Sequence, residues 1–323
     1  MKKVLYITAL LALSVAMFSC KEKLDPESIF PEIDESLDPM AYSFQLDSFC
    51  KRSFLEVYNV EFRYQMQDIS SDMKFNLVPC SYDDAITMAV MVKYLWWDVY
   101  SKVTGSPEFL RMYGPRIICL IGSAGHNATG SVTLGVAQGG IKVTLHAINY
   151  VDPSNVATLN EYYFKTMHHE FSHILHQTKT YPAEFRTISQ GWYLPNGWED
   201  RSEQEARSLG FTGNYGSSQE REDFVEIIAN YIVKTDDEWA SMLSDASKGW
   251  KQDDNGTLHQ LEDDPDGVDG PAVIEQKLNI ARGWMRDEWN IELDSLRAEV
   301  QRRQSNMNID SLRNQVLTIG TAK

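Results

Sequence analysis

Residues 168–177 read HHEFSHILHQ, and within them His169, Glu170 and His173 form an HExxH pattern. On a helix, residues four apart lie one above the other on the same face, so both imidazoles can reach one metal ion. The glutamate between them lies beside that metal, where its carboxylate can activate a bound water molecule. The pattern therefore indicates metal-assisted hydrolysis, with Zn²⁺ as the cofactor.

The pattern requires a helix, and the surrounding sequence predicts one. Thr158 followed by Glu161 is a capping box that predicts a helix start just upstream. The apolar residues fall on one arc of this helix, and His169, His173 and His176 fall on the opposite arc. The apolar arc consists of Tyr163, Phe164, Met167, Phe171, Ile174 and Leu175. We therefore expect the histidines to face a cleft and not the core.

A third ligand must come from another segment. In an extended HExxHxxGxxH motif, His176 would stand in place of the glycine and Lys179 in place of the third histidine, so that motif is absent. Residues 222–233 read EDFVEIIANYIV, a predicted helix that is apolar on nearly every face except a narrow strip. That strip consists of Asp223, Asn230 and Lys234.

Glu222 and Glu226 lie outside the strip, one turn apart on the buried side of this helix. Two buried carboxylates are costly without a positive partner, and a dication held by the histidines would provide one. We expect Glu222 to bind the metal and Glu226 to accept a hydrogen bond from a ligand histidine. The alternative is that one of the glutamates faces a gap or an arginine.

These motifs resemble the gluzincin metallopeptidases, and among them the lethal-factor-like group. There an ExxxE helix follows the HExxH helix after forty to fifty residues, with a tyrosine seven positions before the ligand glutamate. Tyr215 stands seven positions before Glu222. The resemblance covers residues 160–234 and implies a zincin-like fold in which Tyr215 stabilises the oxyanion.

A second resemblance extends over most of the chain. The segment LDSFCKRSFLEVYNVEFRY, together with HExxH and EDFVE, is similar to Bacteroidetes lipoproteins known as substrate-import-associated zinc metallohydrolases, or zinc-binding metallopeptidases. Those lipoproteins accompany outer-membrane nutrient importers with TonB-dependent pores. The resemblance implies such an importer as a partner.

The N-terminus has the features of an export signal. The basic start MKK precedes an apolar run, Val4 to Phe18, which ends at Ser19 and Cys20. Fifteen apolar residues are fewer than the roughly 20 that span a bilayer, so a permanent membrane helix is the weaker alternative. The ending resembles a bacterial lipobox. We expect residues 1–20 to be a signal peptide, Cys20 to carry a lipid, and residues 21–40 to tether the protein to the outer membrane.

Charge and cysteine usage exclude other classes. Asp and Glu outnumber Lys and Arg by 46 to 30, a net charge of −16, which argues against a nucleic-acid partner. If Cys20 is lipidated, Cys50, Cys80 and Cys119 remain, with no CxxC pair. They allow either one disulfide with one buried thiol or three free thiols.

The periodicity of the sequence predicts an α+β fold, with a small mixed sheet beside the HExxH helix. Residues 41–157 are predicted to form an α/β lobe, 158–250 the zinc-binding helices, and 251–323 an acidic loop followed by one or two long helices. In the first lobe we predict helices from Tyr42 and over Asp83–Val103, a strand at Arg116–Ile121, and a hairpin of Ser131–Val136 with Ile141–His146 around a Gln138-Gly139-Gly140 turn. We expect Ile141–His146 to be the sheet edge to which an extended peptide adds.

The favoured interpretation is a zinc peptidase in which His169, His173 and Glu222 hold the metal, Glu170 is the general base and Tyr215 stabilises the oxyanion. One alternative is a non-catalytic lipoprotein that captures peptides or glycans for an importer, but retention of Glu170 argues against it. Another is a metal-stabilised scaffold with His176 as a fourth ligand.

Overall fold

The computed structural model describes residues 37–66, 77–126, 132–133, 135–138, 141–253, 255–261 and 266–320. Residues 39–323 belong to one compact unit. The predicted signal peptide, Cys20 and most of the predicted tether lie outside the described residues. Within the described ranges, no helix combines the length and the apolar character needed to cross a membrane.

A small mixed sheet forms in the first half of this unit. Three strands run parallel, and the fourth is antiparallel to its neighbour. Across the sheet the order is β1 (Glu61–Arg63), β2 (Ile117–Leu120), β6 (Lys142–Leu145) and β5 (Gly135–Gln138). The register pairs Ile118 with Val143 and Leu120 with Leu145, and all four side chains are fully buried. The predicted mixed sheet of an α+β fold is confirmed.

The predicted hairpin is confirmed only in part. Gly135–Gln138 (β5) pairs antiparallel with β6, but Val132 and Thr133 of the predicted first strand pair with β3 (Gly125–His126), and Gln138, predicted in the turn, pairs with Lys142. The Gly139-Gly140 turn lies outside the described residues. However, β6 lies between β2 and β5, so both of its sides are paired. The predicted edge at Ile141–His146 is therefore wrong, because parallel pairing with β2 occupies the other side of β6. The edges of this sheet are β1 and β5, and β5 is the edge on the side of β6. The short strands β3 (Gly125–His126) and β4 (Val132–Thr133) form a separate pair.

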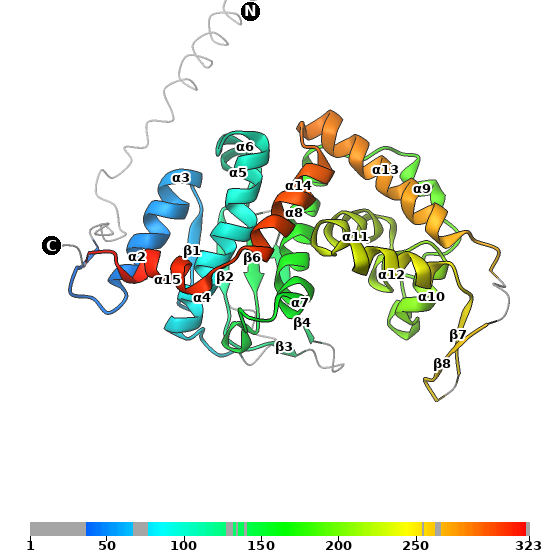
Figure 1. Ribbon diagram of the computed structural model, residues 1–323, viewed down its shortest axis with the longest axis horizontal. Helices are drawn as coiled ribbons and strands as arrows, with labels where there is room; N and C mark the ends of the chain where they lie inside the picture. The colour runs from blue at the N-terminus through cyan, green and yellow to red at the C-terminus, as the bar shows by residue number, and fades with distance from the viewer. Residues whose placement is uncertain are drawn as a thin grey trace, which may run out of the picture. The chain divides into compact units, whose positions relative to one another are not determined.

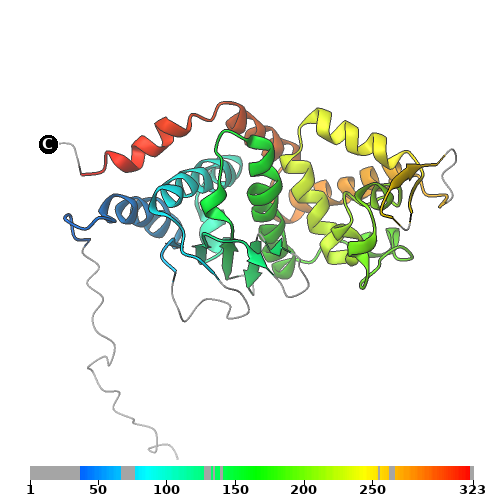
Figure 2. The same ribbon diagram turned by 90° about the horizontal axis from the view of Figure 1, so that it is seen from below.

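Helices from the first half of the chain cover one face of the sheet (Figure 2). The helices predicted from Tyr42 and over Asp83–Val103 are confirmed, and each contains one π-helical turn. The first consists of α2 (Phe44–Cys50), η1 (Lys51–Leu55) and α3 (Glu56–Tyr58). The second consists of α4 (Tyr82–Val92), η3 (Lys93–Trp97) and α5 (Asp98–Thr104). Two shorter helices, α6 (Glu108–Tyr113) and η4 (Ile148–Tyr150), follow. Trp96 and Trp97 are fully buried, so this aromatic pair belongs to the core.

The HExxH motif lies on a helix that runs without a break through α7 (Val156–Leu159), η5 (Asn160–Phe164) and α8 (Lys165–Thr178). This helix begins earlier than predicted, because the Asn155 side chain accepts a hydrogen bond from the backbone N–H of Thr158. The predicted capping box of Thr158 and Glu161 is therefore wrong, and asparagine is as good an N-cap as threonine. The predicted apolar arc is confirmed, since all six of its side chains are buried.

The second helix of interest, α11 (Glu220–Val233), packs antiparallel against α8. Every residue from Glu222 to Val233 is buried. The chain reaches α11 through α9 (Phe185–Ile188), η6 (Trp198–Asp200), α10 (Glu203–Ser208) and η7 (Tyr215–Ser218). It continues through α12 (Asp236–Ala246) and a hairpin of β7 (Trp250–Gln252) with β8 (Leu258–Gln260).

The C-terminal part forms three helices, not the predicted one or two: α13 (Gly270–Trp289), α14 (Leu293–Ser305) and α15 (Ile309–Leu317). α13 ends at Asn290, which adopts a left-handed conformation (φ 54°) that asparagine tolerates. The Asn308 side chain caps the start of α15. The apolar periodicity of the sequence therefore continues across two breaks between helices, one near Asn290 and one near Asn308. Asp269 caps α13, consistent with a turn-rich loop before it. α15 returns to pack against α2 and α4 (Figure 1).

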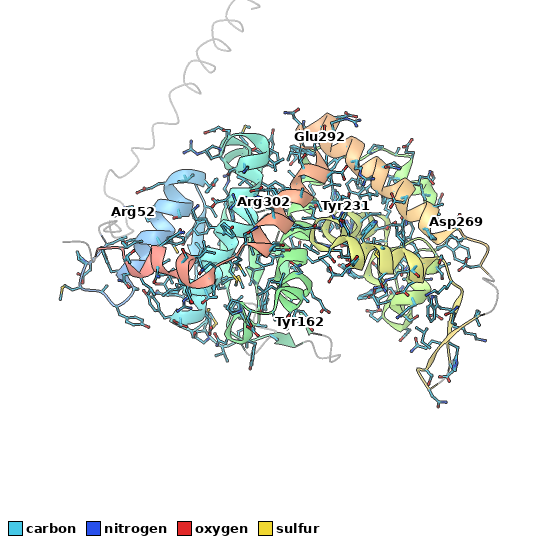
Figure 3. All side chains as sticks on the ribbon, in the orientation of Figure 1. Arg52, Tyr162, Tyr231, Asp269, Glu292 and Arg302 are labelled. Carbon is cyan, nitrogen blue, oxygen red and sulfur yellow. The ribbon has the colours of Figure 1, made fainter. Side chains whose placement is uncertain are left out.

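Aromatic and cationic side chains join these C-terminal helices to α11. The guanidinium groups of Arg282 on α13 and Arg297 on α14 lie 4.9 and 4.5 Å from the ring centre of Tyr231 on α11. The Tyr231 hydroxyl donates a 2.6 Å hydrogen bond to Asp294. Figure 3 labels Tyr231 at this junction. These cation–π and charge-assisted contacts hold α11 against α13 and α14.

A buried ion pair also holds α13 to the start of α11. Lys277 Nζ lies 2.7 Å from Asp223 Oδ2, and the two side chains are 0% and 1% exposed. Lys277 also donates to the carbonyl of Gly210 (2.7 Å) and lies 4.1 Å from the ring centre of Phe211. The Tyr193 hydroxyl donates to the same Asp223 oxygen at 2.8 Å. One ammonium group therefore connects α13, α11 and the segment that leads to η7.

The cysteines in the described part of the chain are free thiols. Cys50 and Cys119 are buried, and Cys80 is half-buried. Of the two arrangements that the sequence allows, the structure has three free thiols.

Replacing Lys277 with methionine should lower the free energy of unfolding by about 3–5 kcal/mol, because Asp223 would remain as an uncompensated buried charge. The double variant Lys277→Met, Asp223→Asn removes both charges and should recover part of the loss. Arg286→Ala is the control, since it breaks an exposed ion pair with Asp287 and should leave stability unchanged. Chemical denaturation measures all three. A Lys277→Met protein as stable as wild type would show that Asp223 does not need Lys277 to compensate its charge.

Candidate metal centre

Two histidines from α8 and one glutamate from α11 converge. His169 Nε2 and His173 Nε2 lie 3.1 Å apart. Glu222 Oε2 lies 3.0 Å from His173 Nε2 and 3.3 Å from His169 Nε2. All three residues offer one ligand atom within 4.8 Å of the others, and His169 and Glu222 are buried. The structure therefore brings together the three residues predicted as ligands.

These separations fit a zinc ion. Ligand atoms about 2.1 Å from a tetrahedral zinc lie about 3.4 Å from one another, within a few tenths of an ångström of the separations here. The donors are two imidazole nitrogens and one carboxylate oxygen, which are ligand types that zinc accepts. The antiparallel contact of α8 with α11 thus places a suitable donor set at one point.

Glu226 lies behind His169, one turn after Glu222 on α11. His169 Nδ1 donates a 2.8 Å hydrogen bond to Glu226 Oε1, which leaves Nε2 facing the other donors. Lys165 Nζ lies 3.4 Å from Glu226 Oε2, and Asn230 donates to the same oxygen at 3.0 Å. Carboxylate contacts of this kind fix the tautomer and the orientation of a ligand histidine.

His176 does not lie among the convergent donors, where a fourth metal ligand would be. Its Nε2 lies 2.8 Å from His173 Nδ1, the nitrogen that faces away from the convergent donors. Among the described residues, His176 therefore belongs behind His173 and is not a fourth ligand. The i, i+3 spacing on α8 brings the two rings together, so the helical pattern contained a signal for this contact.

The charges of the site compensate one another. Burial alone would lower the pKa of His169, but hydrogen bonds with Glu222 and Glu226 raise this pKa to about 9. Burial alone would raise the pKa of Glu222, but His169 and His173 hold it well below its usual range. For Glu226, burial is outweighed by Lys165 and His169, which lower the pKa to about 2. The site thus combines two charged carboxylates with a protonated His169, and a dication bound there would displace that proton.

Tyr215 and Glu170 flank the convergent donors. The Tyr215 ring begins η7 and lies 5.8 Å, centre to centre, from the His169 ring, with 38% of the residue exposed. Burial and then the negative charge of Glu222 raise the pKa of the Tyr215 phenol, so it stays protonated. Glu170 is half-buried, and its charge raises the pKa of both His169 and Tyr215. A carboxylate and a protonated phenol therefore lie near the convergent donors.

One feature of the predicted α11 was wrong. Asp223 and Asn230 were assigned to a polar strip on the side away from the buried carboxylates, yet they are only 1% and 4% exposed. Asp223 is covered by Lys277, and Asn230 hydrogen-bonds Glu226. Gln219 was also missed, and its amide donates to Glu222 Oε1 at 3.3 Å. No sequence spacing could reveal the Lys277 contact, because it joins separate helices.

An HExxH helix that faces a glutamate on a second helix is the arrangement of a zinc-dependent peptidase. Residues 40–294 match a protein family described as "Putative zinc-binding metallo-peptidase". The match covers most of the chain, so the chain belongs to this family. The predictions of a zinc cofactor and of the metallopeptidase class are thereby confirmed.

A solved structure supports the same family. The chain is similar to a protein of the same description from Bacteroides caccae ATCC 43185, known from a crystal structure, with 35% sequence identity and a TM-score of 0.67. The similarity covers 88% of this chain and 99% of that chain. Comparison with curated proteins gives no match.

Glu222 and Glu226 should respond differently to substitution, although they are identical in type and one turn apart. Glu222→Ala should leave the protein unable to hold zinc, because it removes one of three convergent donors. Glu226→Ala should weaken zinc binding by about 10- to 100-fold, because the His169 ring loses its hydrogen-bond partner. Glu220→Ala, on the first turn of the same helix, is the matched control and should bind zinc normally. Competitive titration against a chelator gives the affinities, and a reversed order would refute the assignment.

Proposed function

We propose that the protein hydrolyses peptide bonds as a gluzincin-type zinc peptidase, with His169, His173 and Glu222 as the zinc ligands. The observation that carries this proposal is the convergence of the three donor atoms within 4.8 Å at the contact of α8 with α11. The ligand glutamate comes from a separate helix, which is the feature that defines this type. Glu226 supports the proposal, since it holds His169 in the tautomer that leaves Nε2 free.

The other polar side chains have distinct roles in the proposed reaction. When bound, the zinc ion polarises the substrate carbonyl and lowers the pKa of a water molecule to about 7. Glu170 accepts a proton from the attacking water and later delivers it to the leaving amine. The protonated Tyr215 hydroxyl donates a hydrogen bond to the oxyanion that develops on the carbonyl. His176 and Glu226 keep the two imidazole rings in place.

The sheet offers a way to orient the substrate. β5 is an edge strand, and it packs against α8, the helix that carries the motif. An extended peptide that paired with the outer side of β5 would lie close to α8. In this proposal β5 takes the role that the sequence assigned to Ile141–His146.

Glu170→Gln should keep zinc while lowering kcat by about 10²- to 10⁴-fold, because an amide can neither accept nor deliver the proton. A diverse peptide pool, analysed by mass spectrometry with and without a chelator, provides the substrates. Glu108→Gln, an exposed substitution on α6, serves as the control and should not change turnover. Equal turnover by Glu170→Gln and wild type would show that another group is the base.

The main rival is a lipoprotein that binds peptides or glycans for an importer without cleaving them. A wild-type protein that holds stoichiometric zinc but leaves the whole pool intact would favour this rival. Retention of Glu170 supports the enzyme, because metal binding alone does not require that residue.

We further propose that the protein is exported and attached to the bacterial outer membrane by a lipid on Cys20, where an importer with a TonB-dependent pore is its partner. The basic start, the apolar run and the Ser19-Cys20 ending support this proposal. A net charge of −16 agrees with a peptide or protein substrate and disfavours nucleic acid.

Cys20→Ser should abolish lipidation and move the protein from the membrane fraction to the soluble fraction. Metabolic labelling with a fatty-acid analogue, followed by fractionation and immunoblotting, measures both effects. Cys80→Ser is the control, because that half-buried thiol lies in the folded unit. Wild-type protein that keeps its N-terminal segment and carries no lipid would identify a signal anchor instead.

A further inference from the structure

A polar cavity of about 360 Å³ adjoins the metal centre. It lies where the N-terminal end of α8 and η5 face the C-terminal end of α11, with α10 and α12 completing its wall. Glu226 and Tyr215 line this cavity and also flank the convergent donors. Its volume is at the lower end of the range for small-molecule pockets, roughly 300–1000 Å³, so it suits a single side chain or chain end.

Three cationic side chains line the cavity: Lys165, Arg207 and Lys234. Lys234 is half-buried, and its ammonium group makes no ion pair or hydrogen bond with any residue in the described part of the chain. Arg207 donates to Asp245 at 2.9 Å, but its buried Nε has no partner among the described residues. That Nε is too buried for a ligand to reach, so the ammonium group of Lys234 is the unpaired donor that the cavity offers.

The carboxylates that line the cavity are committed elsewhere or stand near solvent. Glu226 is engaged by His169, Lys165 and Asn230. Glu238 accepts hydrogen bonds from the backbone N–H and hydroxyl of Thr235 at the start of α12. Glu203 is about half exposed and lies beside Arg207, and Glu161 is exposed. Glu238 and Glu203 attract the Lys234 ammonium at longer range, but in the described part of the chain neither is close enough to it for an ion pair.

An unpaired ammonium in such a place is costly. Burial lowers the pKa of Lys234, and the neighbouring charges of Arg207 and Lys165 lower it further, while Glu238 and Glu203 offset only part of this effect. Donors that lose water without gaining a partner cost free energy, and an anionic ligand would remove that cost. The arrangement therefore favours a ligand with a carboxylate.

We propose that this cavity binds a carboxylate of the substrate, from an Asp or Glu side chain or from the C-terminus of a peptide, a few residues to one side of the bond that is cleaved. Lys234 is its principal contact, because Lys165 and Arg207 are already paired with Glu226 and Asp245. This inference rests on the proposed peptidase function, because it names the substrate class of the same site.

The test compares matched peptides that differ by one charge. A fluorogenic peptide cut at a single bond is made with Glu, Gln or Lys at each of the three positions on either side of that bond, and with a free-acid or amidated C-terminus. Wild type should prefer Glu over Gln, or free acid over amide, by about tenfold or more in kcat/KM, the effect of one charge-assisted hydrogen bond. The first preference identifies a side chain as the source of the carboxylate, and the second identifies the C-terminus.

Variants of Lys234 assign the preference to the cavity. Lys234→Met should reduce the preference to less than about threefold, and Lys234→Arg should retain most of it, because the charge-assisted contact is lost in one and kept in the other. Lys234→Glu should favour the Lys peptide. Lys251→Met, at an exposed lysine on β7, is the matched control and should keep the wild-type ratio. Thermal unfolding confirms that each variant is folded.

Binding provides a readout that does not depend on turnover. In zinc-loaded Glu170→Gln protein, calorimetry should show the carboxylate peptide binding about tenfold more tightly than its neutral match, and Lys234→Met should remove this difference. If no peptide is cleaved but this selectivity is present, the peptidase proposal fails and the carboxylate subsite stands. Cleavage without a preference for a carboxylate, or a preference that Lys234→Met leaves unchanged, would overturn the subsite alone.

Discussion

The structure depends on the contact between α8 and α11. Burying a carboxylate costs several kcal/mol unless an opposite charge or hydrogen-bond donors compensate it, and α11 buries Glu222 and Glu226 against the same neighbour. His169, His173 and Lys165 on α8 provide the compensation only if the two helices meet antiparallel and in one register. The sheet below α8 and the helices α13 and α14 behind α11 hold that register. A metal site is the natural result of this charge arrangement.

Local spacing made much of this arrangement predictable. Residues four apart share a helical face whatever the rest of the fold does, so His169 with His173 and Glu222 with Glu226 could be paired from the sequence. The apolar arc of α8 and the presence of a small sheet were predictable for the same reason, because the spacing of apolar residues within a segment indicates helix or strand. The family assignment and the structure agree with the inferred class of zinc peptidase.

Contacts between distant segments were not predictable. Asp223 looked like a surface residue because its partner, Lys277, lies on another helix. The sequence also could not show that β2 would pair with β6 and move the sheet edge to β5, because strand order depends on contacts outside the hairpin. The helix start was misplaced because Asn155 and Thr158 are both good caps, and only the fold selects between them. The sequence likewise could not show that Lys234 lines a cavity, because residues from several distant segments form that cavity.

The return of α15 to the beginning of the unit has a consequence for biosynthesis. The Gln45 side-chain amide donates to the carbonyl of Leu317, 272 residues away, and α15 packs on α2 and α4. Because ribosomes release the N-terminal segment first, the outer side of these early helices stays uncovered until α15 emerges. Closing a loop of this length is slow compared with forming local helices. The nascent chain is therefore exposed to association with other chains for most of its synthesis.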